Sequence, residues 1–86
     1  MIYRIQYHPD IKKDLKKISK SDQKKIRAVI EEKIAKDPIK FGKPLQYSLK
    51  GCRRLRVGDY RVIYKVTKSV ITVLIIKIGH RREVYE

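Results

Sequence analysis

With 86 residues, the chain can form one domain with a single thin core, so a multidomain architecture is excluded and residues 1–86 are expected to be that domain. Hydrophobic residues make up 42% of the chain, which fits a globular protein, and the longest apolar run, 70–78, is too short to cross a bilayer. The formal net charge of +14, from 23 Lys and Arg against 9 Asp and Glu, indicates a polyanionic partner, the alternative being a solvated surface that is merely rich in lysine.

The first half of the chain is expected to form a strand followed by two helices. Residues 2–7 alternate between apolar and polar side chains, which predicts a strand, and Pro9 suits the first turn of a helix. The apolar residues of this first helix recur at helical spacing: Ile11, Leu15 and Ile18. A second helix, capped by Ser21 or Asp22 and ended by Asp37-Pro38, has its own apolar stripe: Ile26, Val29, Ile30 and Ile34.

The second half is expected to be a meander of three strands, at residues 53–57, 60–67 and 70–78. Gly58-Asp59 fits the first hairpin turn, and Lys68-Ser69 fits the second less well. A short strand around 46–49 is expected before them. The sequence therefore predicts an α+β fold, in which an N-terminal strand and a two-helix antiparallel hairpin pack on a mainly antiparallel, twisted sheet of four to five strands.

Arginines are concentrated in the second half of the chain. The first 43 residues hold 11 Lys and 2 Arg, whereas the last 43 hold 4 Lys and 6 Arg, and arginine offers a planar fork for phosphate. If Gly58 and Asp59 are the central turn residues, strand pairing places three side chains on one face of the sheet, here called the arginine face: Arg54, Arg56 and Arg61. Like charges in such proximity destabilise a hairpin, so this face is expected to bind an anion, the alternative being exposure that is merely tolerated. A register slip of one residue would move the whole set to the opposite face.

The segment after the last expected strand combines groups that RNA chemistry uses. His80 offers an imidazole that can move protons near neutral pH, and Arg81 and Arg82 offer guanidiniums for phosphate. Tyr85 offers an aromatic ring on which a base can stack. A frayed terminus is the alternative interpretation of this segment.

Three stretches of the sequence together resemble the RelE/ParE superfamily of toxins from type II toxin–antitoxin systems. They are Leu49-Lys50-Gly51, the segment 54–64 with its pattern R-x-G-x-Y-R-x-x-Y, and the segment 79–85 with G-H-R-R-x-V-Y. The resemblance covers essentially the whole chain, including the helical hairpin before the sheet. The superfamily holds RNA-cleaving toxins and gyrase-poisoning toxins on one scaffold, so the fold alone does not assign the activity.

For the RNA-cleaving branch, the resemblance implies an endoribonuclease that cuts messenger RNA in the ribosomal A site by attack of the ribose 2′-hydroxyl, leaving a 2′,3′-cyclic phosphate. It implies that Arg54 and Arg56 are the two basic strand residues and that Arg61 steadies the phosphorane. It also implies that Arg81 stabilises the phosphate or leaving group and that Tyr85 stacks on a base. Further RNA contacts are expected from Lys50, Arg53 and Arg82.

The general base is where this sequence departs from the RelE pattern. In that pattern the two basic strand residues are lysines, one of which can act as the base, whereas the arginines found here do not release a proton near neutrality. His80 is the leading candidate for the base, with a purely structural tail residue as the alternative. Lys50 is the second candidate, and His8 is expected to belong to the junction before the first helix.

The resemblance implies messenger RNA and the ribosome as targets, and a cognate antitoxin whose acidic or amphipathic segment covers the basic face. No Cys/His cluster indicates a metal and no Gly-rich loop indicates a phosphate-bearing cofactor, so none is expected. A single cysteine, Cys52, and the lack of a signal peptide favour the cytoplasm. The alternative function is that of a ParE-like, non-enzymatic inhibitor of DNA gyrase, although that branch usually lacks the terminal arginine–tyrosine pair.

Overall fold

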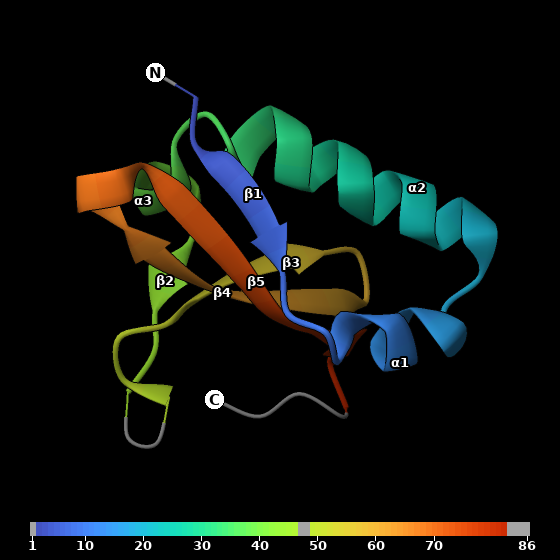
Figure 1. The fold of residues 1–86 in the computed structure, drawn as a ribbon. Coiled ribbons are helices and arrows are strands. Elements are labelled where there is room, and N and C mark those ends of the chain that lie inside the picture. The colour runs from blue at the N-terminus through green and yellow to red at the C-terminus, as the bar shows by residue number, and fades with distance from the viewer. Residues whose placement is uncertain (1, 47–48, 83–86) are drawn as a thin grey trace.

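The computed structural model describes residues 2–46 and 49–82, in which five strands form one sheet with helices packed against it (Figure 1). The elements in chain order are β1 (Arg4–Tyr7), α1 (Ile11–Lys16), α2 (Lys20–Val29), the π-helical turn η1 (Ile30–Ile34), α3 (Pro38–Phe41), β2 (Lys43–Pro44), β3 (Arg53–Val57), β4 (Tyr60–Thr67), the 3-10 turn η3 (Lys68–Val70) and β5 (Thr72–His80). The chain runs rightward through α1 in Figure 1 and returns leftward through α2. The α+β fold and the helical hairpin expected from the sequence are therefore confirmed.

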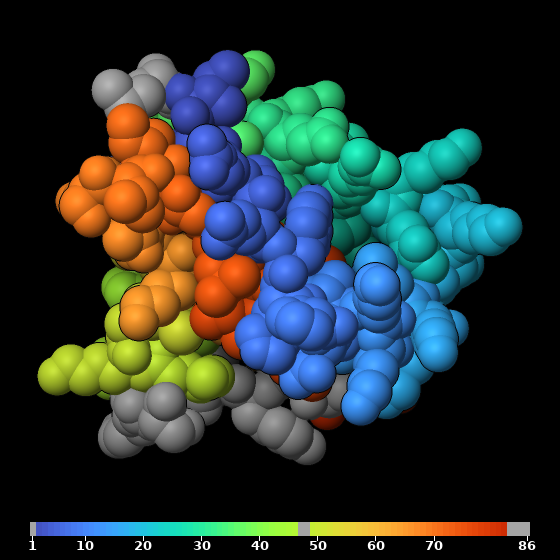
Figure 2. Space-filling view, in the orientation of Figure 1, coloured from blue at the N-terminus to red at the C-terminus, as the bar shows by residue number. Residues whose placement is uncertain are grey.

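The sheet is mixed because the first strand pairs with the last. Its order is β1-β5-β4-β3-β2, with β1 parallel to β5 and all other neighbours antiparallel. In the space-filling view, the blue surface of β1 and α1 lies directly against the orange-red surface of β5 (Figure 2). Within the described ranges, no helix combines the length and the apolar character needed to cross a membrane.

The main core lies between the helices and the sheet. Its buried members come from both layers and are Ile11, Ile18, Ile26, Ile30, Ile34, Val62, Tyr64, Val73, Ile75 and Ile78. Fully burying an aliphatic side chain of this size contributes about 1.5–3 kcal/mol, so this cluster supplies the main drive for folding. The π turn lets Ile34 and Ala35 both be buried, since Ala35 N–H donates to the carbonyl oxygen of Ile30 (2.8 Å) and one extra residue enters the turn.

Two helix boundaries differ from the expectation. Ser19, not Ser21 or Asp22, caps α2: its backbone is still extended and its hydroxyl accepts the N–H of Asp22 (3.2 Å). Asp37 does more than end the second helix, because its carboxylate accepts the N–H of Lys40 (3.1 Å) and so caps α3.

The prediction of a strand around residues 46–49 is wrong. The strand is β2, Lys43–Pro44, and Gln46 lies outside it, while 47–48 lie outside the described residues. Pro44 fits here because β2 is an edge strand, where a missing N–H does no harm.

Lys68 and Ser69 do not form a two-residue hairpin turn. Thr67 pairs with Thr72, and the four residues between them form η3 and end at Ile71, whose φ is 48°. β5 therefore begins and ends two residues later than expected. A β-branched residue rarely adopts a positive φ, so nothing in the local sequence announces this turn.

α3 is attached to the sheet by two side chains. The Tyr64 hydroxyl donates to the carbonyl oxygen of Pro38 (2.7 Å), and Arg53 Nη2 donates to the carbonyl oxygens of Ile39 and Gly42 (2.6 Å each). A Cβ atom on Gly42 would overlap the Tyr64 hydroxyl, so glycine is required for this close approach. Burial raises the pKa of that hydroxyl, against a smaller, lowering contribution from Arg53.

Candidate active site

The β3–β4 hairpin has the register that the sequence predicts. Its pairs include Val57 with Tyr60, Arg56 with Arg61, Leu55 with Val62 and Arg54 with Ile63. Gly58 has a φ of 58°, which the first central residue of a two-residue hairpin turn commonly needs. Val62 faces the core, so alternation places Arg54, Arg56 and Arg61 on the side of the sheet away from the helices. The arginine face is therefore confirmed as a structural feature.

The guanidiniums of this face are close enough to affect one another. The pKa of Arg54 is lowered, first by partial burial and then by the positive charges of Arg61 and Arg56. This arrangement disfavours the charged state of Arg54, and an anion bound beside it would favour that state again. The face is thus a region of strong positive potential on the side of the sheet away from the helices.

Lys43 is a cation of this face that the sequence analysis did not assign. In the sheet it pairs with Arg54 across β2 and β3, and paired residues share a side. Its side chain is exposed. The two-residue strand that places it carries no periodicity of its own, so only the pairing reveals the position.

An apolar wall covers part of the same side of the sheet. Ile63, which pairs with Arg54, packs with Leu45 in a second buried cluster, and Leu49 and Cys52 lie against it. The backbone N–H of Leu45 donates to the carbonyl oxygen of Cys52 (3.0 Å), which closes this loop over Ile63. Of the three arginines on this side, Arg56 is exposed, whereas Arg54 and Arg61 are half-buried.

Of the residues expected to contact RNA, Arg53 is not brought to this face. Arg53 pairs with Tyr64 and so lies on the helix side of the sheet, where its guanidinium is engaged with α3. Lys50 is exposed in the turn before β3. The placement of Arg53 on the helix side cannot be predicted without the strand register, because Arg53 and Arg54 are adjacent residues of the same type.

His80 also lies on the helix side of the sheet. It pairs with Tyr60, and the two rings meet edge to face with their centroids 5.9 Å apart and an interplanar angle of 80°. Gly79, which precedes His80, pairs with Arg61, which follows Tyr60, and this pair lies on the opposite side of the sheet. The structure therefore separates the imidazole from the arginine face.

The residues after β5 leave the sheet beside the β3–β4 turn. Arg81 N–H donates to the carbonyl oxygen of Asp59 (2.8 Å), and both Arg81 and Arg82 are exposed. Tyr85 lies outside the described residues. His8 occupies the junction before α1, as expected, and its Nδ1 accepts the N–H of Asp10 (3.1 Å).

This geometry defines what the site can do. Arg54, Arg56 and Arg61 can bind a phosphate and stabilise the extra negative charge of a pentavalent transition state. They cannot serve as a general base near neutral pH. Among the residues that the structure describes, no group of three or more His, Cys, Asp or Glu side chains could hold a metal ion.

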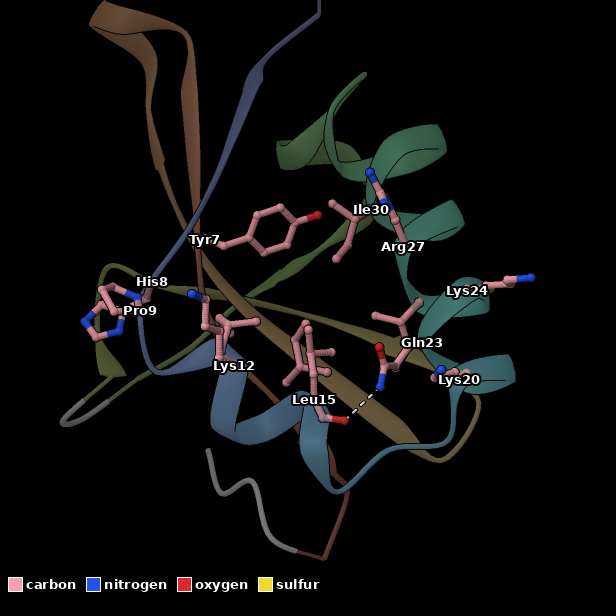
Figure 3. A pocket seen from close by; sticks show the side chains of 13 residues that line it. Tyr7, His8, Pro9, Lys12, Leu15, Lys20, Gln23, Lys24, Arg27 and Ile30 are labelled. Carbon is pink, nitrogen blue, oxygen red and sulfur yellow. Dashed lines mark hydrogen bonds between the residues drawn. The ribbon is translucent and has the colours of Figure 1, made fainter.

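A groove between the two helices and β1 is a second concave feature, and the sequence analysis did not find it. It has a volume of about 520 Å³ and an apolar floor that includes Leu15, Ile26, Ile30 and Ile78. Figure 3 shows basic side chains around the groove: Lys12, Lys20, Lys24 and Arg27. The Gln23 amide spans its closed end, donating to the carbonyl oxygens of Leu15 (2.8 Å) and Ile18 (2.9 Å).

Comparison with known proteins places the chain among toxins. The family described as "ParE toxin of type II toxin-antitoxin system, parDE" matches residues 5–85. The toxin RelG of Mycobacterium tuberculosis is 30% identical over 99% of this chain and 98% of its own length.

Solved structures agree with these sequence comparisons. The toxin–antitoxin complex RelBE2 from Mycobacterium tuberculosis contains a chain with a TM-score of 0.88 and 26% identity, covering 94% of this chain and 100% of that one. The archaeal RelE–RelB complex from Pyrococcus horikoshii contains one with a TM-score of 0.66 and 26% identity, covering 98% and 100%. The chain belongs to the RelE/ParE superfamily of toxins from type II toxin–antitoxin systems.

Proposed function

We propose that this toxin is an endoribonuclease that cuts messenger RNA, and that cutting takes place in the ribosomal A site. The observation that carries the proposal is the arginine face, on which Arg54, Arg56 and Arg61 share one side of the hairpin. Three guanidiniums gathered on one side of a hairpin offer planar forks that suit the oxygens of a phosphate. The curated relatives named RelG and RelE support the same assignment.

The reaction proposed is an internal transfer at phosphorus. The ribose 2′-oxygen forms a bond to the adjacent phosphorus while the 5′-oxygen of the next nucleotide leaves. The 2′-hydroxyl loses a proton, the leaving oxygen gains one, and the product carries a 2′,3′-cyclic phosphate. Arg61 stabilises the equatorial oxygens, Arg54 and Arg56 hold the phosphate, and Arg81 neutralises the leaving group.

Inhibition of DNA gyrase is the second candidate function, because the matching family is described by the ParE toxin. A toxin of that kind needs a protein-binding surface rather than convergent phosphate ligands. The two functions are separated by incubating the protein with translating ribosomes, mapping the new RNA ends, and measuring gyrase supercoiling in parallel. Ends that carry 2′,3′-cyclic phosphate, with gyrase unaffected, support the endoribonuclease; inhibited supercoiling with intact messenger contradicts it.

The partner of this toxin is a cognate antitoxin, as in the RelBE2 and RelE–RelB complexes of its structural relatives. We propose that the groove between the helices receives a helical segment of that antitoxin. Apolar residues of the segment would fill the floor at Leu15 and Ile30, and acidic residues beside them would face Lys20 and Lys24. This location leaves the arginine face for another part of the antitoxin or for RNA.

A further inference from the structure

The two histidines of the chain make the same local hydrogen bond at the carboxyl ends of two parallel strands. His8 directly follows β1, and His80 is the last residue of β5. His8 Nδ1 accepts the backbone N–H of Asp10 (3.1 Å), and His80 Nδ1 accepts that of Arg82 (3.2 Å). Each ring thus acts as an Asn or Asp side chain does in an Asx turn, accepting an N–H two residues later and turning the chain.

The ring of His80 is in addition fixed from the helix side. It packs edge to face against the ring of Tyr60, with the two ring centroids 5.9 Å apart. The Tyr60 hydroxyl in turn donates a hydrogen bond to Asp22 Oδ2 of α2 (3.1 Å). The imidazole is half-buried between these groups. The side chain of His8 is 43% exposed, and Figure 3 shows its ring turned away from the groove.

The hydrogen bond of His80 acts on the residues that leave the sheet beside the arginine face. Arg81 N–H is bonded to the carbonyl oxygen of Asp59 in the β3–β4 turn (2.8 Å), and Arg82 N–H is bonded to the imidazole. Two successive backbone N–H groups are therefore fixed. Together they hold Arg81 next to the hairpin that carries the arginine face.

We infer that His80 is a positioning residue for Arg81, and that its contribution to messenger cleavage is the Nδ1 lone pair rather than proton transfer. The inference rests on the proposed function, because it gives Arg81 a part in the reaction. His80 shares its side of the sheet with Tyr60, whereas Arg61 lies on the other side. In the neutral ring, an Nδ1 that accepts the Arg82 N–H leaves the proton on Nε2, so neither nitrogen has a free lone pair for the proton of a 2′-hydroxyl held at the arginine face.

Two substitutions separate the acceptor from the ring. His80→Asn keeps a side-chain oxygen that can accept the N–H two residues later but removes the ring, and His80→Phe keeps a ring against Tyr60 but removes the acceptor. We expect single-turnover messenger cleavage by His80→Asn to stay within a few-fold of the parent rate. His80→Phe should cut roughly 10–100-fold more slowly, since a displacement of about 1 Å in a positioned group costs up to about 10²-fold. The RNA concentration at half-saturation should change little.

His8 provides the matched control. His8→Phe removes the same kind of hydrogen bond from the turn after β1, which leads into α1 and not toward the arginine face, so cleavage should be unchanged. Amide hydrogen exchange of Arg82, followed by NMR, reads the His80 bond without reference to activity. It should be slow in the parent and in His80→Asn, and faster in His80→Phe.

The outcomes separate the inference from the proposed function. Equal and severe slowing of both His80 variants is the behaviour of a general base and would overturn the positioning role, as would two variants that both match the parent. A parent protein that cuts no messenger on translating ribosomes overturns the proposed function itself. Rescue by Asn but not by Phe, with Arg82 exchange following the same order, supports the inference.

Discussion

Arg61 occupies the middle of the arginine face, with Arg56 opposite it on β3 and Gly79 opposite it on β5. The buried glycine contributes no side chain, so Arg56 is the cross-strand neighbour of Arg61 within the arginine face. Arg61 is therefore the residue whose removal should affect the transition state most.

We expect Arg61→Ala to lower the cleavage rate by on the order of 10²–10³, the effect of losing a preorganised contact worth roughly 2.7–4 kcal/mol of barrier. Arg4→Ala, which removes an exposed arginine from β1 at the far edge of the sheet, is the control and should cut at the parent rate. Single-turnover assays on ribosome-bound messenger measure both. An Arg61→Ala protein that cuts as fast as the parent would remove the arginine face from the mechanism.

Tyr64 makes stability depend on alkaline pH. Burial raises its pKa above the ordinary value of 10.0 that the unfolded chain retains. Between those two values the unfolded state has lost the proton and the native state keeps it, so the free energy of unfolding falls as pH rises above about 10. Urea unfolding at a series of pH values should show this loss in the parent. Tyr64→Phe should show a shallower one, and an identical slope in both proteins would contradict the assignment.

At the scale of elements, the attachment of α3 depends on one tight contact. Gly42→Ala places a Cβ against the Tyr64 hydroxyl, and overpacking of this kind costs typically 1–3 kcal/mol. Tyr64→Phe alone loses the bond to Pro38 but makes room for the methyl group. We therefore expect the double variant to be more stable than the sum of the single effects predicts, as measured by denaturant unfolding. Strict additivity would show that the two groups do not meet.

The groove between α1 and α2 should respond to charge reversal. Lys24→Glu should slow association with the antitoxin and weaken its salt dependence, because a cation at the rim of an interface acts mainly on the encounter. Lys36→Glu makes the same change on an exposed residue outside the groove and serves as the control. Stopped-flow binding of the purified antitoxin measures the rates. Equal effects of the two substitutions would argue against docking in the groove, and messenger cleavage should be unchanged in both.

The elements also show where the sequence is informative. Alternation of polar and apolar residues in 54–57 and 60–62, together with the Gly58 turn, predicts the β3–β4 register, so the arginine face follows from the sequence alone. The β4–β5 connection does not, because it depends on Ile71 at a positive φ that tertiary pairing imposes. The position of His80 could not be predicted either. The sequence shows only that it precedes Arg81, whereas its pairing with Tyr60 shows that it lies on the side of the sheet opposite the arginine face.

For the whole molecule, the net charge of +14 should make RNA binding strongly dependent on salt. On single strands, each phosphate contact contributes a slope of about −0.7 to the logarithm of affinity against the logarithm of salt concentration. Removing one contact with Arg56→Ala should make the slope less steep by about that amount. Fluorescence anisotropy with a short RNA across a salt series measures it. A nearly flat dependence in the parent would favour a protein target.

The parallel pairing of β1 with β5 has a consequence for how the protein is made. Arg4 pairs with Thr72, so in a nascent chain β1 has no partner until residues 72–75 have left the ribosome. Contacts between such distant residues also form slowly, because a long loop must close before they stabilise anything. Until then Ile5 and its neighbours lack the strand against which they pack, and β4 lacks a partner on one edge. The sheet therefore stays incomplete, with β1 unpaired, until the residues of β5 have been synthesised and are free to fold.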